Sequence, residues 1–69
     1  MIKISSEGTA SCRVFLNGEL FIDETLPFKN CMLRWSANQS ITKIYVINTG
    51  QHKLVANGVK IRPGHGMTV

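Results

Sequence analysis

Four side chains in this sequence could serve as nucleophiles, bases or metal ligands: Cys12, Cys31, His52 and His65. Their spacing contains no Cys-x-x-Cys or His-x-x-x-His pair, the arrangement that nucleates a tetrahedral zinc site. Catalysis by either cysteine would need a histidine base and an orienting carboxylate at fixed geometry, and no motif supplies that geometry. We therefore predict no metal, no cofactor, no small-molecule substrate and no enzymatic activity, and expect both cysteines to be reduced and buried.

The charged residues offer a second kind of chemistry, because they are distributed unevenly. The chain has 8 Lys and Arg, 4 Asp and Glu, and a formal net charge of +4. All acids lie at or before Glu24, and the basic residues after it are Lys29, Arg34, Lys43, Lys53, Lys60 and Arg62. This basic part can attract an anion, either a nucleic acid or an acidic protein surface, including the acidic part of another copy. Alternatively, the lysines keep strand edges solvated and unpaired.

Length and composition limit the classes of protein that fit. A chain of 69 residues forms at most one small domain, and so short a chain buries only about 60% of its unfolded surface. A large enzyme with a deep cleft is excluded, and 43% hydrophobic against 17% charged residues argues against disorder. Lys3 is not followed by the long apolar segment that a signal peptide needs, and the longest uninterrupted apolar run in the sequence is Ile44 to Ile47. We therefore expect no signal peptide, no membrane partner and a cytoplasmic location, in the host cytoplasm or the virion if the chain derives from a phage.

Evenly spaced turn signals predict an all-β fold. Short segments rich in Ile, Val and Thr lie between Gly, Asn and Pro clusters, a pattern typical of a small antiparallel β-sandwich or partly open barrel. We expect a single β domain over residues 1–69 with about six or seven short strands. Two Asn-Gly pairs, Asn17-Gly18 and Asn57-Gly58, predict tight hairpins because both residues accept positive φ. The two hairpins look alike, but the sequence predicts no internal repeat.

The second hairpin has a well-defined register. Its turn places Ala56 opposite Val59, Val55 opposite Lys60, Leu54 opposite Ile61, and Lys53 opposite Arg62. One face then carries Leu54, Ala56, Val59 and Ile61 and belongs to the core. The other face carries Lys53, Val55, Lys60 and Arg62 and is expected to be solvated. Tyr45, with Lys43 on the same face, could add a stacking ring if its strand neighbours this hairpin.

The first hairpin is apolar on both faces. Its turn pairs Leu16 with Glu19, Phe15 with Leu20, Val14 with Phe21, and Arg13 with Ile22. Such a strand pair is either covered on both sides or meets another chain through its outer face. We expect the apolar contact to be made by Phe15, Leu20 and Ile22.

Two further segments complete the predicted strands. Residues 25–36 fit a helix capped by Thr25, but the alternation of Cys31, Leu33 and Trp35 favours a strand over about residues 30–36. Residues 41–48 are rich in β-branched side chains and predict a central strand. A turn at residues 63–66 leads to a last short strand over residues 67–69.

The C-terminal part resembles a recurrent string in small β-sandwich modules of tailed-phage virion and adhesion proteins. The matching residues are Ile44 to Gly50, Leu54 to Gly64 and Met67 to Val69. In those modules a strand ends in Asn-x-Gly, a hairpin turns at Asn-Gly-Val, and a Pro-Gly turn leads to a closing strand. The resemblance implies a structural or attachment module that works as several copies, and it assigns no binding residue.

Two functional hypotheses follow. The first is a non-enzymatic protein-interaction module of phage origin, a virion component or a small inhibitor of a host complex, which docks on a larger assembly or on copies of itself. The apolar residues of the first hairpin would supply contact, and Lys53, Lys60 and Arg62 would steer the encounter. The alternative is a small OB-like or SH3-like nucleic-acid-binding protein. Its phosphate-tracking surface would comprise Arg34, Lys43, Tyr45, Lys53, Lys60 and Arg62.

Overall fold

The computed structural model describes residues 1–26, 30–35 and 40–69, and in them it contains eight β-strands and no helix. In chain order the strands are β1 (Ile2–Ser6), β2 (Ala10–Leu16), β3 (Glu19–Leu26), β4 (Asn30–Leu33), β5 (Ile44–Asn48), β6 (Leu54–Ala56), β7 (Val59–Ile61) and β8 (Gly66–Thr68). The all-β prediction is confirmed, with β1 as the strand that the sequence pattern did not identify. A strand at β4 is also confirmed, although it ends at Leu33, before the predicted end near residue 36. The helical alternative is wrong there and at residues 25 and 26, which belong to β3. The rest of that alternative, at residues 27–29 and 36, lies outside the described residues.

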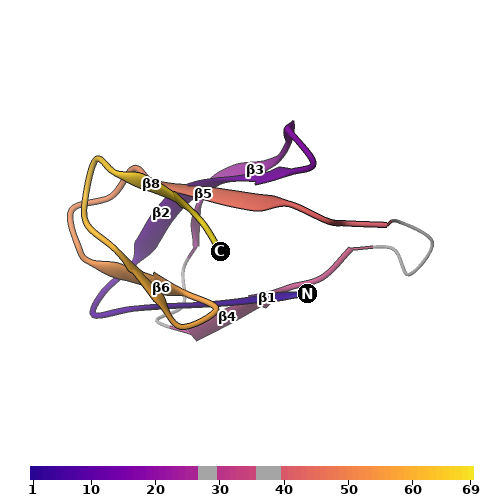
Figure 1. Cartoon of the computed structure of the whole chain (residues 1–69). Coiled ribbons are helices and arrows are strands. Elements are labelled where there is room, and N and C mark those ends of the chain that lie inside the picture. Colours follow the sequence, from indigo (N-terminus) through magenta and orange to yellow (C-terminus); the bar gives the residue numbers. More distant parts are fainter. Residues whose placement is uncertain (27–29, 36–39) are drawn as a thin grey trace.

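The strands form two four-stranded antiparallel sheets packed face to face. One sheet has the order β4-β1-β6-β7 and the other β3-β2-β5-β8. Figure 1 shows them as two layers, with β1, β4 and β6 in one and β2, β3, β5 and β8 in the other. No strand pairing joins the two sheets within the described chain, so the fold is a sandwich and not a barrel.

The core lies between the two layers and is built mainly by alternation along the strands. Along β2, Cys12 and Val14 are fully buried while Arg13 between them is exposed, because successive side chains of a strand point to opposite faces. The same alternation on β1 buries Ile2 and Ile4. The buried apolar residues are Ile2, Ile4, Ala10, Cys12, Val14, Leu16, Val46, Leu54, Ala56 and Ile61.

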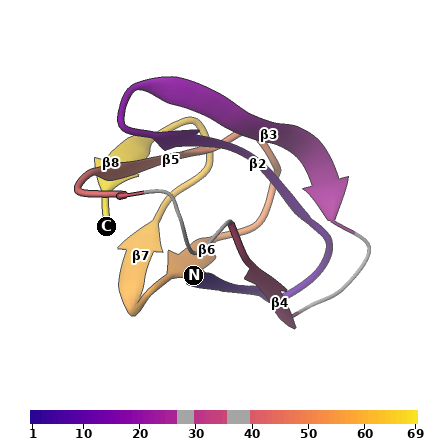
Figure 2. The same cartoon turned by 90° about the vertical axis from the view of Figure 1, so that its right-hand side faces the viewer.

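The two halves of the chain repeat the same strand plan, which the sequence did not predict. Exchanging β1 with β5, β2 with β6, β3 with β7 and β4 with β8 converts the order of one sheet into that of the other. The register agrees as well: Ile4 lies opposite Ala56, and Ile44, 40 residues after Ile4, lies opposite Leu16, 40 residues before Ala56. Each sheet therefore combines the outer strands of one half with the hairpin of the other half. Figure 2 shows the two hairpins, β2-β3 and β6-β7, in opposite layers.

The two Asn-Gly turns occupy equivalent places in this repeat. Asn17 and Asn57 have φ of 52° and 47°, and the glycines after them have φ of 84° and 82°, as a two-residue hairpin turn with positive φ at both positions requires. The backbone N–H of Asn17 donates to the Lys43 carbonyl, and that of Asn57 donates to the Lys3 carbonyl, each at 2.9 Å. Both predicted turns are confirmed, and each also ties its hairpin to the neighbouring strand.

The register of the second hairpin is confirmed, whereas that of the first changes beyond its turn. Leu54 lies opposite Ile61, Val55 opposite Lys60 and Ala56 opposite Val59. In the first hairpin Leu16 opposes Glu19 and Phe15 opposes Leu20, but the next pairs are Val14 with Ile22 and Arg13 with Asp23. Phe21 is thus the extra residue of a β-bulge, and the predicted pairs of Val14 with Phe21 and Arg13 with Ile22 are wrong. A bulge inserts one unpaired residue and shifts every later pair by one.

Candidate interaction surface

The outer faces of the two sheets differ although their backbones are equivalent. One row of side chains across β3, β2, β5 and β8 consists of Leu20, Phe15, Tyr45 and Thr68. The equivalent row across β7, β6, β1 and β4 consists of Lys60, Val55, Ser5 and Asn30. The first row, which we call the apolar row, is not required by the strand plan, because the same plan is built on the other sheet with a row in which Val55 is the one apolar residue.

Two aromatic rings form the centre of the apolar row. Phe15 and Tyr45 lie opposite each other on β2 and β5, with ring centroids 6.4 Å apart and planes inclined at 50°. Tyr45 leans over the backbone of β8, where its hydroxyl and ring lie so close to Gly66 that a side chain at position 66 would collide with them. The absence of a side chain at Gly66 therefore leaves the space that the tyrosine ring occupies, an arrangement in which an aromatic ring covers a glycine of a neighbouring strand.

A hollow of about 390 Å³ lies on the same face as these rings. It is lined by Phe15, Gly18, Lys43, Tyr45, Ile47 and Thr68. Leu20, at the end of the row on edge strand β3, is 55% exposed and protrudes beside it. The face thus has both a protruding aliphatic side chain and a mainly apolar recess, features typical of a protein-binding surface.

Charged groups flank the apolar row. The Arg13 Nε lies 3.2 Å from the Asp23 Oδ2, and each side chain is about half exposed. This ion pair exists because the bulge at Phe21 brings Asp23, instead of Ile22, opposite Arg13. Solvent exposure keeps its contribution to stability small, at most about 1 kcal/mol. Lys43 supplies a cation in the hollow. Glu19 and Glu24 of edge strand β3 lie opposite the buried Leu16 and Cys12, so they belong to the inner side of the sheet.

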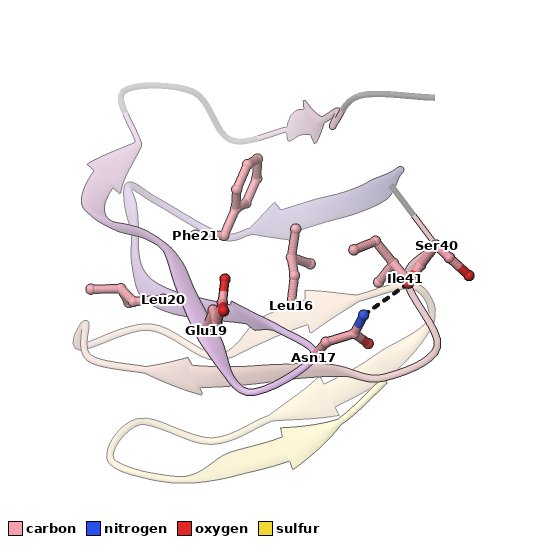
Figure 3. A pocket seen from close by; sticks show the side chains of 7 residues that line it. All are labelled: Leu16, Asn17, Glu19, Leu20, Phe21, Ser40 and Ile41. Carbon is pink, nitrogen blue, oxygen red and sulfur yellow. Dashed lines mark hydrogen bonds between the residues drawn. The ribbon is translucent and has the colours of Figure 1, made fainter. Parts of the chain in front are cut away.

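Ile22 does not belong to this surface, contrary to the prediction that grouped it with Phe15 and Leu20. It lies opposite the fully buried Val14 and packs against the core, as does its neighbour Phe21. Figure 3 shows Leu20 pointing away from the side chains of Leu16 and Phe21. The bulge allows two successive residues of β3 to contact the core.

A second hollow, of about 300 Å³, lies at the end of the sandwich beside the first hairpin turn. Its wall is held by Asn17, whose amide nitrogen donates to the Ser40 carbonyl at 2.8 Å (Figure 3). The Asn17 Oδ1 accepts from the backbone N–H groups of Thr42 and Lys43 and from the Thr42 hydroxyl. These bonds hold the segment before β5 in place and thereby position Lys43 on the face that carries the apolar row.

The structure separates the predicted basic surface into three places. Lys53, Lys60 and Arg62 are exposed in and beside the β6-β7 hairpin. Arg34 follows β4, at the other edge of the same sheet, and Lys43 and Tyr45 lie on the opposite sheet. Because β5 does not neighbour the β6-β7 hairpin, the condition for Tyr45 to stack beside those cations is not met. Lys3 on β1, which the sequence hypotheses omitted, shares the sheet of that hairpin.

The candidate nucleophiles and metal ligands are not assembled into a site. Cys12 is fully buried in the core, and the side chain of Cys31 lies outside the described residues. The imidazole of His52 lies against Gly8, and His65 is exposed in the loop before β8. In residues 1–26, 30–35 and 40–69, no group of three or more His, Cys, Asp or Glu could hold a metal ion. The same residues include no helix able to cross a membrane.

Comparisons with known proteins give no relative for this chain. No protein-family model, no curated protein and no solved structure matches it.

Proposed function

We propose that this protein is a non-enzymatic interaction module that binds another protein surface through its apolar row. The observation that carries this proposal is the contrast between equivalent rows. Leu20, Phe15 and Tyr45 occupy the positions that Lys60, Val55 and Ser5 occupy on the other sheet. Since either kind of row is compatible with the fold, three large apolar side chains side by side on the outer face of one sheet are best explained by a binding partner.

The chemistry of the row supports protein as the partner. Aromatic side chains give large contact area with few rotatable bonds, and they are enriched at the centres of protein interfaces. The charged groups of Arg13, Asp23 and Lys43 lie around this centre, as in a polar rim. Docking on a larger phage assembly, as a virion component or an inhibitor, is the setting that the resemblance of residues 44–69 suggests.

Nucleic-acid binding is less well supported, because most of the cations assigned to that function lie apart from the exposed aromatic rings. Lys53, Lys60 and Arg62 belong to one sheet, whereas Phe15 and Tyr45 are on the outer face of the other. Phe21 and Trp35 pack edge to face, with centroids 6.3 Å apart, against the core. A single-stranded nucleic acid is usually held by cations and stacking rings together on one face.

A photo-cross-linking experiment with paired positions tests the proposal. A benzoylphenylalanine is placed at position 20 or at the equivalent position 60, and each variant is irradiated in cells of the source organism. We expect discrete protein adducts from position 20 and few from position 60. Equal adduct patterns from both positions, or none from position 20, would show that the apolar row is not a binding surface. Adducts with nucleic acid from position 60 would favour the alternative function.

A further inference from the structure

We infer that the partner of the apolar row binds through an acidic segment, which places a large apolar side chain in the hollow beside Phe15 and Tyr45 and a neighbouring Asp or Glu carboxylate against Lys43. This inference rests on the proposed function and names the chemistry of the partner. Three properties of the face support it: the lining of the hollow, the position of Lys43, and the placement of the acids of the chain away from that lysine.

The hollow has the size and the lining for an apolar side chain. Its volume is about 390 Å³, and Phe15, Tyr45 and Ile47 make its surface mainly apolar. Pockets that enclose a whole small ligand run from roughly 300 to 1,000 Å³, so this hollow is near the lower limit. An apolar side chain of a partner leaves water on entering it, and this burial provides most of the affinity.

Lys43 is exposed at the border of this hollow, and its backbone is held in place. Its N–H donates to the Asn17 Oδ1 at 3.1 Å, and its carbonyl accepts from the Asn17 N–H at 2.9 Å. The next residue, Ile44, lies opposite Leu16 and packs against the core, so alternation puts the lysine on the outer face with Tyr45. A carboxylate beside a side chain bound in the hollow can therefore reach the ammonium group.

None of the four acids of the chain, all of which are among the described residues, forms an ion pair with Lys43. The two glutamates of β3 belong to the inner side of the sheet, and Asp23 is paired with Arg13 at 3.2 Å. Glu7 lines a separate hollow together with Lys53. The face of the apolar row is therefore left with one unbalanced positive charge, which favours an acidic partner. A second copy bound face to face would present the same lysine and no free carboxylate.

A nucleic acid fits this face less well than an acidic protein segment. Phosphate backbones are held by several cations that follow the strand. In the described part of the chain, this face carries one lysine or arginine outside an ion pair, Lys43. The Tyr45 ring also covers Gly66, which leaves less of it free to stack on a base.

A carbodiimide reaction tests the carboxylate directly, because this reagent joins a lysine amine to a carboxylate where the two are in contact. The protein is treated in extracts of the source cells, and linked peptides are identified by mass spectrometry. We expect an amide, formed with loss of water, between Lys43 and an Asp or Glu of the protein that position 20 captures. Position-20 adducts with a protein to which Lys43 gives no link, or a link from Lys43 to nucleic acid, would overturn the inference.

Matched variants test the charge by a second measurement, the yield of position-20 adducts. Lys43→Glu should lower this yield at least about tenfold, because repulsion replaces attraction, whereas Lys43→Arg should keep it within about threefold. Lys3→Glu is the control, since Lys3 holds the equivalent place on the other sheet, where its N–H donates to the Asn57 Oδ1 at 3.0 Å. Thermal unfolding of each variant verifies that these exposed positions leave the fold intact.

The outcomes separate this inference from the proposed function. Adducts that form equally in Lys43→Glu and in the protein with Lys43 intact, or that fall equally in Lys43→Glu and Lys3→Glu, refute the acidic segment and leave the binding surface standing. No adducts from position 20 in the protein with Lys43 intact refute the binding surface itself, and the acidic segment with it.

Discussion

Replacing Asn48 with alanine removes a buried polar side chain that joins three segments of the fold. Asn48 is 1% exposed. Its amide nitrogen donates to the carbonyl oxygens of His52 at 2.8 Å and Ile61 at 3.0 Å, and its Oδ1 accepts from the Gly50 N–H at 3.0 Å. The residue thereby holds the turn after β5 and connects one sheet to strand β7 of the other.

The cost of Asn48→Ala follows from the partners left behind. The bond to the Ile61 carbonyl is buried, so that oxygen loses its partner without replacement by water. Such a group costs about 1–3 kcal/mol. The other two bonds are partly buried, and each contributes about 0.5–1 kcal/mol. We expect a loss of about 3 kcal/mol. A 69-residue domain has a total stability of only about 3–10 kcal/mol.

Urea unfolding followed by tryptophan fluorescence measures this loss. Trp35 is the single tryptophan, and its edge-to-face contact with Phe21 reports on the packed core. With a urea dependence of about 1 kcal/mol per molar, the midpoint should fall by about 3 M, or the variant should be unfolded in buffer. Gln51→Ala, an exposed change in the same turn, is the control and should shift the midpoint by less than about 0.5 M. A similarly small shift for Asn48→Ala would refute the assigned role of this side chain.

Three further outcomes are expected. Gly66→Ala places a Cβ against the Tyr45 ring and should lower the free energy of unfolding in urea by about 1–3 kcal/mol. In the double variant with Tyr45→Ala the collision is absent, so the two losses should be less than additive; additive losses would contradict the contact. Asn17→Gly should destabilise by about 1–2 kcal/mol more than Asn57→Gly, because the turn φ is kept in both while Asn17 loses side-chain bonds to three residues and Asn57 loses its bond to the Lys3 N–H; equal midpoints would argue against the role of the Asn17 side chain. Cys12 should react with a thiol reagent only on unfolding, as stopped-flow labelling would show, and rapid reaction of both thiols in the native protein would rule this out.

Local features of the sequence were sufficient to predict the hairpins and the inward face of the second one. Asn17-Gly18 and Asn57-Gly58 identify their own turns, and a two-residue loop sets the pairs beside it. Leu54, Ala56 and Ile61 alternate with an outer face that carries three cations and Val55, so their burial could be deduced from the register. Phe15 and Leu20 were likewise identified as outward-facing apolar residues.

The predictions that failed depended on relations between distant parts of the chain. Nothing adjacent to Phe21 in the sequence reveals a bulge there, because it is the core that accommodates both Phe21 and Ile22. The buried role of Asn48 also depends on carbonyl groups from His52 and Ile61. In the sequence Asn48 appears simply as a turn residue.

The sequence by itself determined which residues alternate, where the chain turns and which strands must pair as hairpins, since these properties arise within a few residues. The tertiary structure alone decided which sheet each strand joins. Alternation specifies one side of a strand but not its neighbour, and β5 pairs with β2, about 30 residues earlier, instead of with the adjacent β6. That choice places Tyr45 and Lys60 on different sheets, so the predicted single basic surface does not form. It leaves Leu20, Phe15 and Tyr45 together on one face.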